Sequence, residues 1–115
     1  MTDLRYPIGP LTMPDSMTPG EIKAGIRVMA ETPANLRRAV AGLSDAQLDP
    51  PYRPDGWTVR QVVHHVPDSH INSYVRFKLG LTEDHPTIKP YEEKLWAEMD
   101  DAKNIPVEIS ISLLD

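Results

Sequence analysis

Three of the chain's four histidines, His64, His65 and His70, lie within a stretch of seven residues, and the fourth is His85. Imidazole is the commonest side-chain ligand for metal ions and the usual proton carrier near neutral pH, so this crowding could mark a site. No two of these histidines are four residues apart, the spacing that places a metal-binding pair on one helix face. The pattern therefore predicts a single ligand of a site that several helices assemble.

These histidines fall on a segment that is predicted to form a central helix from residue 58 to about residue 81. Thr58 and Gln61 have the spacing of a capping box at its start. At about 100° per residue, one face of this helix is apolar and a second apolar strip lies almost opposite. A polar stripe separates the two and consists of His65, Ser69, Asn72 and Arg76. A helix that is apolar on two sides belongs in the centre of a fold, and its polar stripe is expected to line a site.

The residues around the stripe are assigned different roles. His65 is the candidate ligand, and Asp68 is a candidate to orient an imidazole, although a solvated carboxylate is the simpler interpretation. His64 and His70 are expected to be structural, at the edge of the core. Pro67 is unexpected inside a helix, because it removes one backbone hydrogen bond at a cost of ~3 kcal/mol unless the helix kinks. The chain has no serine-nucleophile motif and no phosphate-binding glycine loop.

The remaining periodicity predicts helices joined by proline-rich connectors. The expected elements are an extended arm over residues 1–17, helices over 19–31 and 33–43 that Pro33 separates, a single helical turn from residue 44, and a short helix over 91–99. Residues 91–94 are expected to form a solvated face. The last stretch, 107–115, alternates like a strand, yet Ile109 and Leu113 have helical spacing, so both structures remain open.

Composition limits the class of protein. A chain of 115 residues forms one domain at most. The formal net charge of −5 argues against binding to nucleic acid, which needs a basic face. The absence of cysteine excludes a thiolate zinc site, so a metal would be bound by His, Asp or Glu. The sequence has no signal peptide and no membrane-spanning apolar run, so a soluble protein of the cytoplasm is expected.

Five segments resemble the YfiT branch of the DinB-like superfamily. They span residues 4–9, 42–49, 51–65, 68–79 and 86–92, so the resemblance runs along almost the whole chain. It implies an all-α fold, an antiparallel up-and-down four-helix bundle that usually forms a homodimer. It also implies a divalent ion, zinc or nickel, held by three histidines. One of these corresponds to His65, and the other two form an HxxxH pair on the last helix of the bundle.

The resemblance further implies a metal-dependent hydrolase that acts on a small molecule with metal-activated water. An open site of three histidines leaves a coordination position for that water. Relatives in the superfamily are thiol S-transferases that activate a low-molecular-weight thiol such as bacillithiol, so this chemistry is the alternative.

The sequence departs from the family pattern in two respects. Pro67 lies directly beside the ligand position, where a rotation of His65 or a kink could follow. No HxxxH motif occurs in the 115 residues. We therefore expect residues 1–115 to form the N-terminal two-thirds of the bundle, with the last helix missing and the site incomplete, and the chain to be inactive by itself.

Two other interpretations remain open at this stage. A partner chain could supply the missing ligands. Alternatively, the short chain could be a non-catalytic protein that acts only through association. Apolar residues near the end, including Ile109, Ile111, Leu113 and Leu114, would favour association because they have little to pack against.

Overall fold

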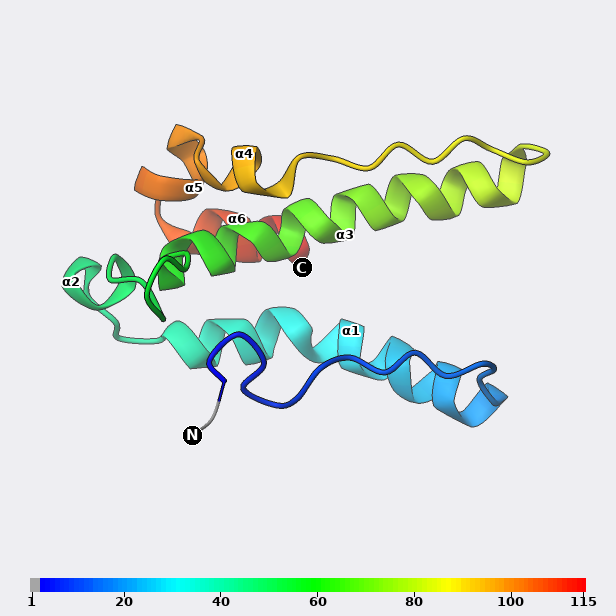
Figure 1. The fold of residues 1–115 in the computed structure, drawn as a ribbon, viewed down its shortest axis with the longest axis horizontal. Helices are drawn as coiled ribbons and strands as arrows, with labels where there is room; N and C mark the ends of the chain where they lie inside the picture. The colour runs from blue at the N-terminus through cyan, green and yellow to red at the C-terminus, as the bar shows by residue number, and fades with distance from the viewer. Residues whose placement is uncertain (1–2) are drawn as a thin grey trace.

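The computed structural model describes residues 3–115 and is helical, with no strand in that range. Met1 and Thr2, the first residues of the predicted arm and domain, lie outside the described residues. The elements are α1 (Pro19–Val40), α2 (Asp45–Leu48), α3 (Val59–Thr82), α4 (Glu93–Ala97), α5 (Asp100–Asn104) and α6 (Val107–Leu114). The two long helices, α1 and α3, run in opposite directions (Figure 1). An all-α, up-and-down arrangement was predicted and is confirmed.

The central helix α3 begins and ends almost where the sequence predicts. At its start, the Thr58 amide donates to Gln61 Oε1 at 2.9 Å, and the Gln61 amide donates to Thr58 Oγ1 at 3.1 Å. This reciprocal capping box satisfies two of the amide groups that a helix N-terminus leaves without partners. Gln61 has a second role, because its Nε2 donates to the Ala97 carbonyl at 2.6 Å and so ties α3 to α4.

Helix α1 is continuous from Pro19 to Val40, so the predicted break at Pro33 is wrong. A proline inside a helix removes one hydrogen bond to the preceding turn and bends the helix without having to end it. The two ends of α1 are stabilised in different ways. Thr18 and Glu21 form a capping box at the start, and Arg37 near the end forms a bidentate ion pair with Glu108 of α6, with contacts of 2.7 to 3.1 Å. Pro33 itself is buried.

The C-terminal third differs from the prediction in one place and resolves the open choice in another. The helix expected over 91–99 is shorter, Glu93–Ala97, and a separate helix follows over Asp100–Asn104. The last stretch is helical. Its two buried residues, Ser110 and Ile111, lie between the half-buried Val107 and Leu114, and this three-to-four-residue spacing is that of an amphipathic helix.

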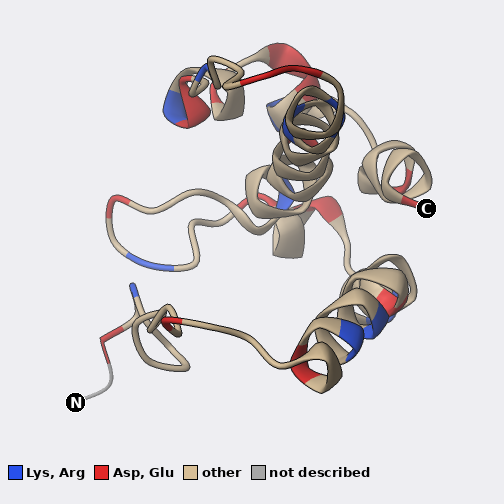
Figure 2. Ribbon diagram, turned by 90° about the vertical axis from the view of Figure 1, so that its right-hand side faces the viewer, with Lys and Arg blue, Asp and Glu red and all other residues tan. Residues whose placement is uncertain are grey.

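Helix α6 connects the two long helices. It makes its most extensive contacts with α3 and also packs against α1 (Figures 1 and 2). The buried apolar core is correspondingly small and consists of Leu48, Val63, Ala97, Ala102 and Ile111. The apolar face predicted for α3 is buried at Val63 but is exposed farther along, where Phe77 is 70% exposed. A large part of the apolar surface of α1 and α3 therefore has no cover within the described residues.

Charged residues of both signs are interspersed along α1 in place of a single basic face (Figure 2). None of the helices among residues 3–115 combines the length and the apolar character needed to cross a membrane.

Candidate metal centre and the adjoining groove

The His65 ring lies in the second turn of α3 and is positioned by aromatic neighbours. Its centroid is 4.9 Å from that of Trp57, with the rings tilted by 55°, and 6.5 Å from that of Tyr91, with the rings 21° from parallel. Neither ring nitrogen of His65 forms a hydrogen bond with any residue in the range 3–115. Aromatic packing therefore restricts the orientation of the ring and leaves both nitrogens available as ligands.

Trp57 is fixed by the turn that precedes α3. The Tyr52 amide donates to the Trp57 carbonyl at 3.0 Å, next to an isolated antiparallel bridge between Pro51 and Thr58. Gly56 is required in this turn, because a Cβ atom there would lie 2.6 Å from Arg53 Cγ and 3.1 Å from the Arg53 carbonyl oxygen. Trp57, at the start of α3, therefore packs against the candidate ligand.

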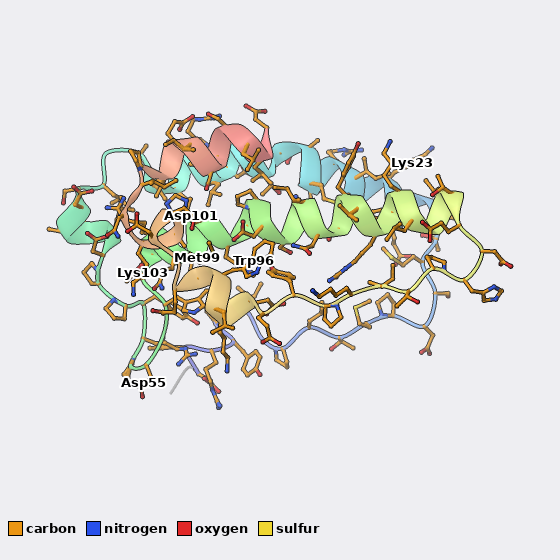
Figure 3. All side chains as sticks on the ribbon, turned by 90° about the horizontal axis from the view of Figure 1, so that it is seen from above. Lys23, Asp55, Trp96, Met99, Asp101 and Lys103 are labelled. Atoms are coloured by element: carbon orange, nitrogen blue, oxygen red, sulfur yellow. The ribbon has the colours of Figure 1, made fainter. Side chains whose placement is uncertain are left out.

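Tyr91 and Trp96 belong to the same aromatic cluster, although no sequence pattern indicated that they lie beside His65. Their ring centroids are 4.7 Å apart, and Trp96 lies in the space between α4 and α3 (Figure 3). The Tyr91 hydroxyl is buried and has no hydrogen-bond partner among the described residues. Burial raises the pKa of Tyr91, the nearby carboxylates of Glu93 and Asp68 reinforce this shift, and the Arg76 guanidinium opposes it. The expectation that residue 91 belongs to a solvated face is therefore wrong, since Tyr91 is half-buried against His65.

Asn72 and Arg76 of the predicted polar stripe, and Asp68 next to the stripe, have separate environments. Burial raises the pKa of Asp68, Asp101 raises it further, and the nearby His65 opposes the shift. Asn72 Nδ2 donates to the Asp68 carbonyl at 2.8 Å, a bond within its own helix. Arg76 Nη2 donates to the Lys89 carbonyl at 3.3 Å. Asp68 is half-buried, in a less solvated setting than the simplest interpretation of the sequence suggested.

Asn72 and Arg76 line a groove of about 820 Å³. Its opposite wall is the segment that follows the loop after α3, with Lys89, Tyr91 and Trp96. The stripe therefore does line a cavity, as predicted, but only at its C-terminal half. His65 lies behind Tyr91 and borders the groove without forming part of its wall.

The described residues do not complete a metal site. Within residues 3–115, no three side chains of His, Cys, Asp or Glu are close enough to bind one ion. A catalytic zinc ion ordinarily takes three protein ligands. His65 fits one of these positions, because its ring nitrogens are free, and the remaining ligands are not among these residues.

His64 is a structural residue, as predicted. It is buried between α3 and the C-terminal region, where its Nε2 lies 3.0 Å from the Ile105 carbonyl and its Nδ1 lies 2.6 Å from Ser110 Oγ. A carbonyl only accepts, so Nε2 carries the proton and the Ser110 hydroxyl donates to Nδ1. Burial lowers the pKa of His64, consistent with this neutral form. His70 is half-buried and lies with Leu113 and Leu114 around a small pocket away from His65.

Ser110→Ala is expected to lower the free energy of unfolding by about 1–2 kcal/mol, because it leaves the buried Nδ1 of His64 without a donor. Chemical denaturation followed by circular dichroism measures this change. Ser112→Ala on the exposed side of α6 is the control and is expected to stay within about 0.5 kcal/mol of the parent. Equal effects of the two substitutions would show that the His64–Ser110 hydrogen bond does not stabilise the fold.

Arg60 is a second structural residue that the sequence analysis did not identify. Its side chain is buried, with Nε 2.7 Å from Asp49 Oδ1, Nη2 2.5 Å from Asp45 Oδ1, and Nη1 3.1 Å from the Ile105 carbonyl. These contacts join α2, the residue after it and the residue after α5 to the first turn of α3. Arg60 thus holds the end of the helix that carries His65.

Comparison with known proteins agrees with this arrangement. Residues 29–105 match the model of the DinB superfamily, and the chain belongs to that family. Proteins named "Putative metal-dependent hydrolase" from Bacillus mycoides (strain KBAB4) and Bacillus cereus (strain B4264) are each 55% identical to it over 115 residues. All of this chain is covered, and it spans 66% of the length of these relatives.

A solved structure has the same fold. YfiT from Bacillus subtilis, described as a probable metal-dependent hydrolase with an unusual four-helix bundle topology, aligns with a TM-score of 0.92 and 51% sequence identity. The alignment covers 96% of this chain and 63% of YfiT. The predicted relation to a YfiT-type helical bundle is confirmed.

Proposed function

We propose that this chain forms part of a metal-dependent hydrolase in which His65 is one ligand of a divalent ion. The observation that carries the proposal is the state of the His65 ring, which is held between Trp57 and Tyr91 while both nitrogens remain free of hydrogen bonds. A histidine held by packing alone, beside a groove, can turn either nitrogen toward a metal. The names of the relatives from Bacillus support the same activity.

The remaining ligands would come from residues beyond those described, since one imidazole does not hold a catalytic ion. The resemblance to the YfiT branch suggests an HxxxH pair and either zinc or nickel. Such an ion supplies a bound water of lowered pKa, the nucleophile of hydrolytic metal sites. The part of this chain is to orient His65, through Trp57 and Tyr91, and to provide the adjoining groove for a small-molecule substrate.

We also propose that the complete protein is a homodimer. The resemblance to the YfiT branch supports this proposal, and exposed apolar side chains such as Ile26, Phe77 and Leu81 would be covered by the rest of the bundle or by the second subunit. Sedimentation of the complete protein tests this proposal, and a monomer at micromolar concentration would contradict it.

The metal proposal predicts a loss of metal binding in one variant. The chain, extended by the part of the Bacillus mycoides relative that it does not match, is expected to bind one divalent ion per subunit. His65→Ala in this extended protein is expected to abolish that binding, measured by elemental analysis after dialysis. The 115-residue chain alone is expected to retain no stoichiometric ion.

His85→Ala is the matched control, because His85 is fully solvated in the loop after α3, next to Asp84, and is expected to leave the metal content unchanged. Unchanged metal content in His65→Ala would refute the ligand assignment.

Assays of the metal-loaded protein then separate the two chemistries. Ester or amide hydrolysis supports the hydrolase, and consumption of a thiol with an electrophile would instead assign an S-transferase.

A further inference from the structure

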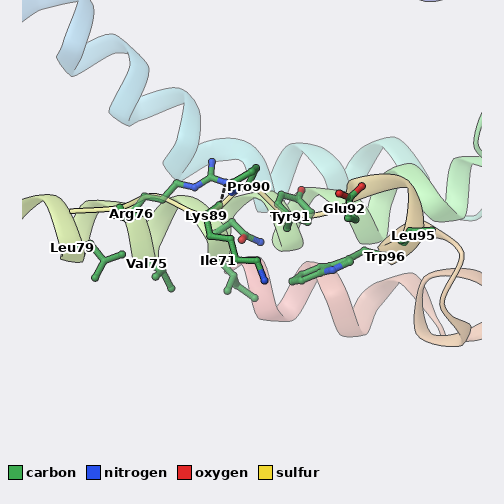
Figure 4. A pocket seen from close by; sticks show the side chains of 12 residues that line it. Ile71, Val75, Arg76, Leu79, Lys89, Pro90, Tyr91, Glu92, Leu95 and Trp96 are labelled. Atoms are coloured by element: carbon green, nitrogen blue, oxygen red, sulfur yellow. Dashed lines mark hydrogen bonds between the residues drawn. The ribbon is translucent and has the colours of Figure 1, made fainter. Parts of the chain in front are cut away.

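The groove beside His65 has a distinct chemical pattern along its length. It lies between the second half of α3 and the extended segment that leads into α4 (Figure 4). One wall is apolar and consists of Ile71, Val75 and Leu79. Arg76 and Lys89 lie toward one end, and Tyr91 and Trp96 lie toward the other (Figure 4). The volume of about 820 Å³ is within the range of small-molecule sites.

At the basic end of the groove, Arg76 and Lys89 have no carboxylate partner among residues 3–115. The single hydrogen bond of the Arg76 guanidinium is a long one, 3.3 Å, to the Lys89 carbonyl. In a chain with a net charge of −5, two cations that line the same groove and lack acidic partners among the described residues leave a locally positive position. An anionic group would be attracted there, and a guanidinium can bind a carboxylate through two hydrogen bonds.

The other end of the groove offers a polar group that lacks a partner. The buried Tyr91 hydroxyl has no hydrogen-bond partner among the described residues, and a buried polar group without one is destabilising. A ligand atom or an ordered water in the groove would satisfy it. This end is also the one that adjoins His65, at 6.5 Å between the ring centroids of His65 and Tyr91.

We infer that this groove binds an elongated small molecule with an apolar body and a carboxylate at one end. The carboxylate pairs with Arg76 and Lys89, the apolar body lies along Ile71 and Val75, and the opposite end reaches Tyr91. If this molecule is the substrate class of the enzyme, the inference rests on the proposed function, because the end of the molecule at Tyr91 would lie beside the metal ligand His65. Binding to the groove itself requires no metal.

The test uses the 115-residue chain without metal and 4-phenylbutyrate as the probe, followed by NMR. We expect 4-phenylbutyrate to shift the Trp96 indole N–H and the amides of residues 71–79 and 87–96. The uncharged 4-phenylbutan-1-ol is expected to bind the parent chain about tenfold more weakly than the acid does. The Arg76→Gln variant is expected to bind 4-phenylbutyrate about tenfold more weakly than the parent does. In both cases a charge-assisted hydrogen bond is lost. Arg27→Gln, a charge change of the same kind on α1, is expected to leave binding unchanged.

Lys89→Gln, on the opposite wall, provides an independent variant with an expected weakening of about fivefold. Equal binding of the acid and the alcohol would overturn the inference and show an apolar surface without selectivity. Shifts confined to α1 and α6, or no binding by either probe, would also overturn it. No metal is present in this experiment. If the probes do not bind, the assignment of His65 as a metal ligand is unaffected. If His65 proves not to be a ligand, the result of the binding experiment is unaffected.

Discussion

Ile111→Ala is expected to lower the free energy of unfolding by about 2–5 kcal/mol, the range for removing a buried isoleucine side chain. Ile111 is 0% exposed and lies on α6, the helix that contacts both long helices. The buried core of the described residues is small, so little of it could shift to fill the cavity. Since domains of this size are stable by only about 5–15 kcal/mol, this loss would leave a measurable unfolded fraction.

Ile109→Ala on the same helix is the matched control. Ile109 is 55% exposed, so its truncation removes little buried surface and is expected to change stability by less than about 1 kcal/mol. Urea denaturation of the two variants, followed by far-ultraviolet circular dichroism, compares their free energies of unfolding. If Ile109→Ala were the more destabilising substitution, α6 would pack through its other face and the position of the helix would have to be revised.

Signals that lie within one or two turns of the chain were sufficient to predict most of the fold. The capping residues Thr18 and Thr58 mark the starts of the two long helices, because a side chain three residues away completes the cap. The periodicity of α3 also predicted that the stripe from His65 to Arg76 would face a cavity, and its second half does. Local sequence carries these features because the groups involved are covalently close.

Pro33 was the main source of error in the helix boundaries, whereas α3 was predicted to continue through Pro67 and does so. Pro33 and Pro67 both lie inside helices that continue through them, and both are buried. A proline removes one hydrogen bond wherever it occurs, but whether the helix ends there depends on packing on either side. For Pro67 that packing is with α6, since Pro67 and Leu113 line the same small pocket. Such packing depends on residues far away in the sequence.

The candidate site could be predicted only in part for the same reason. His65 was named as the candidate ligand from its place on α3 and from the resemblance. Its aromatic neighbour Tyr91 is 26 positions away in the sequence and lies in an extended segment without periodicity. Likewise the partner of His64 is Ser110, on a helix whose existence the sequence left open. Contacts of this kind arise when α4 to α6 fold back onto α3, and no local pattern encodes them.

Arg60→Met is expected to lower the free energy of unfolding by about 2–4 kcal/mol, because it removes two charge-assisted hydrogen bonds and a third to the Ile105 carbonyl. Methionine keeps most of the buried volume, so the loss reports the guanidinium rather than a cavity. The two carboxylates are not left buried, since the side chains of Asp45 and Asp49 are 85% and 52% exposed and can rehydrate. The larger penalties known for breaking fully buried ion pairs are therefore not expected.

Arg27→Met on α1 is the control, with an expected change within about 0.5 kcal/mol. Asp49→Asn tests the origin of the effect, because it weakens one contact of Arg60 and leaves the guanidinium in place. Substitutions that act on one interaction are not additive, so Asp49→Asn is expected to have almost no further effect in the Arg60→Met background. Full additivity in this double-mutant cycle would mean that the 2.7 Å contact between Arg60 and Asp49 does not stabilise the start of α3.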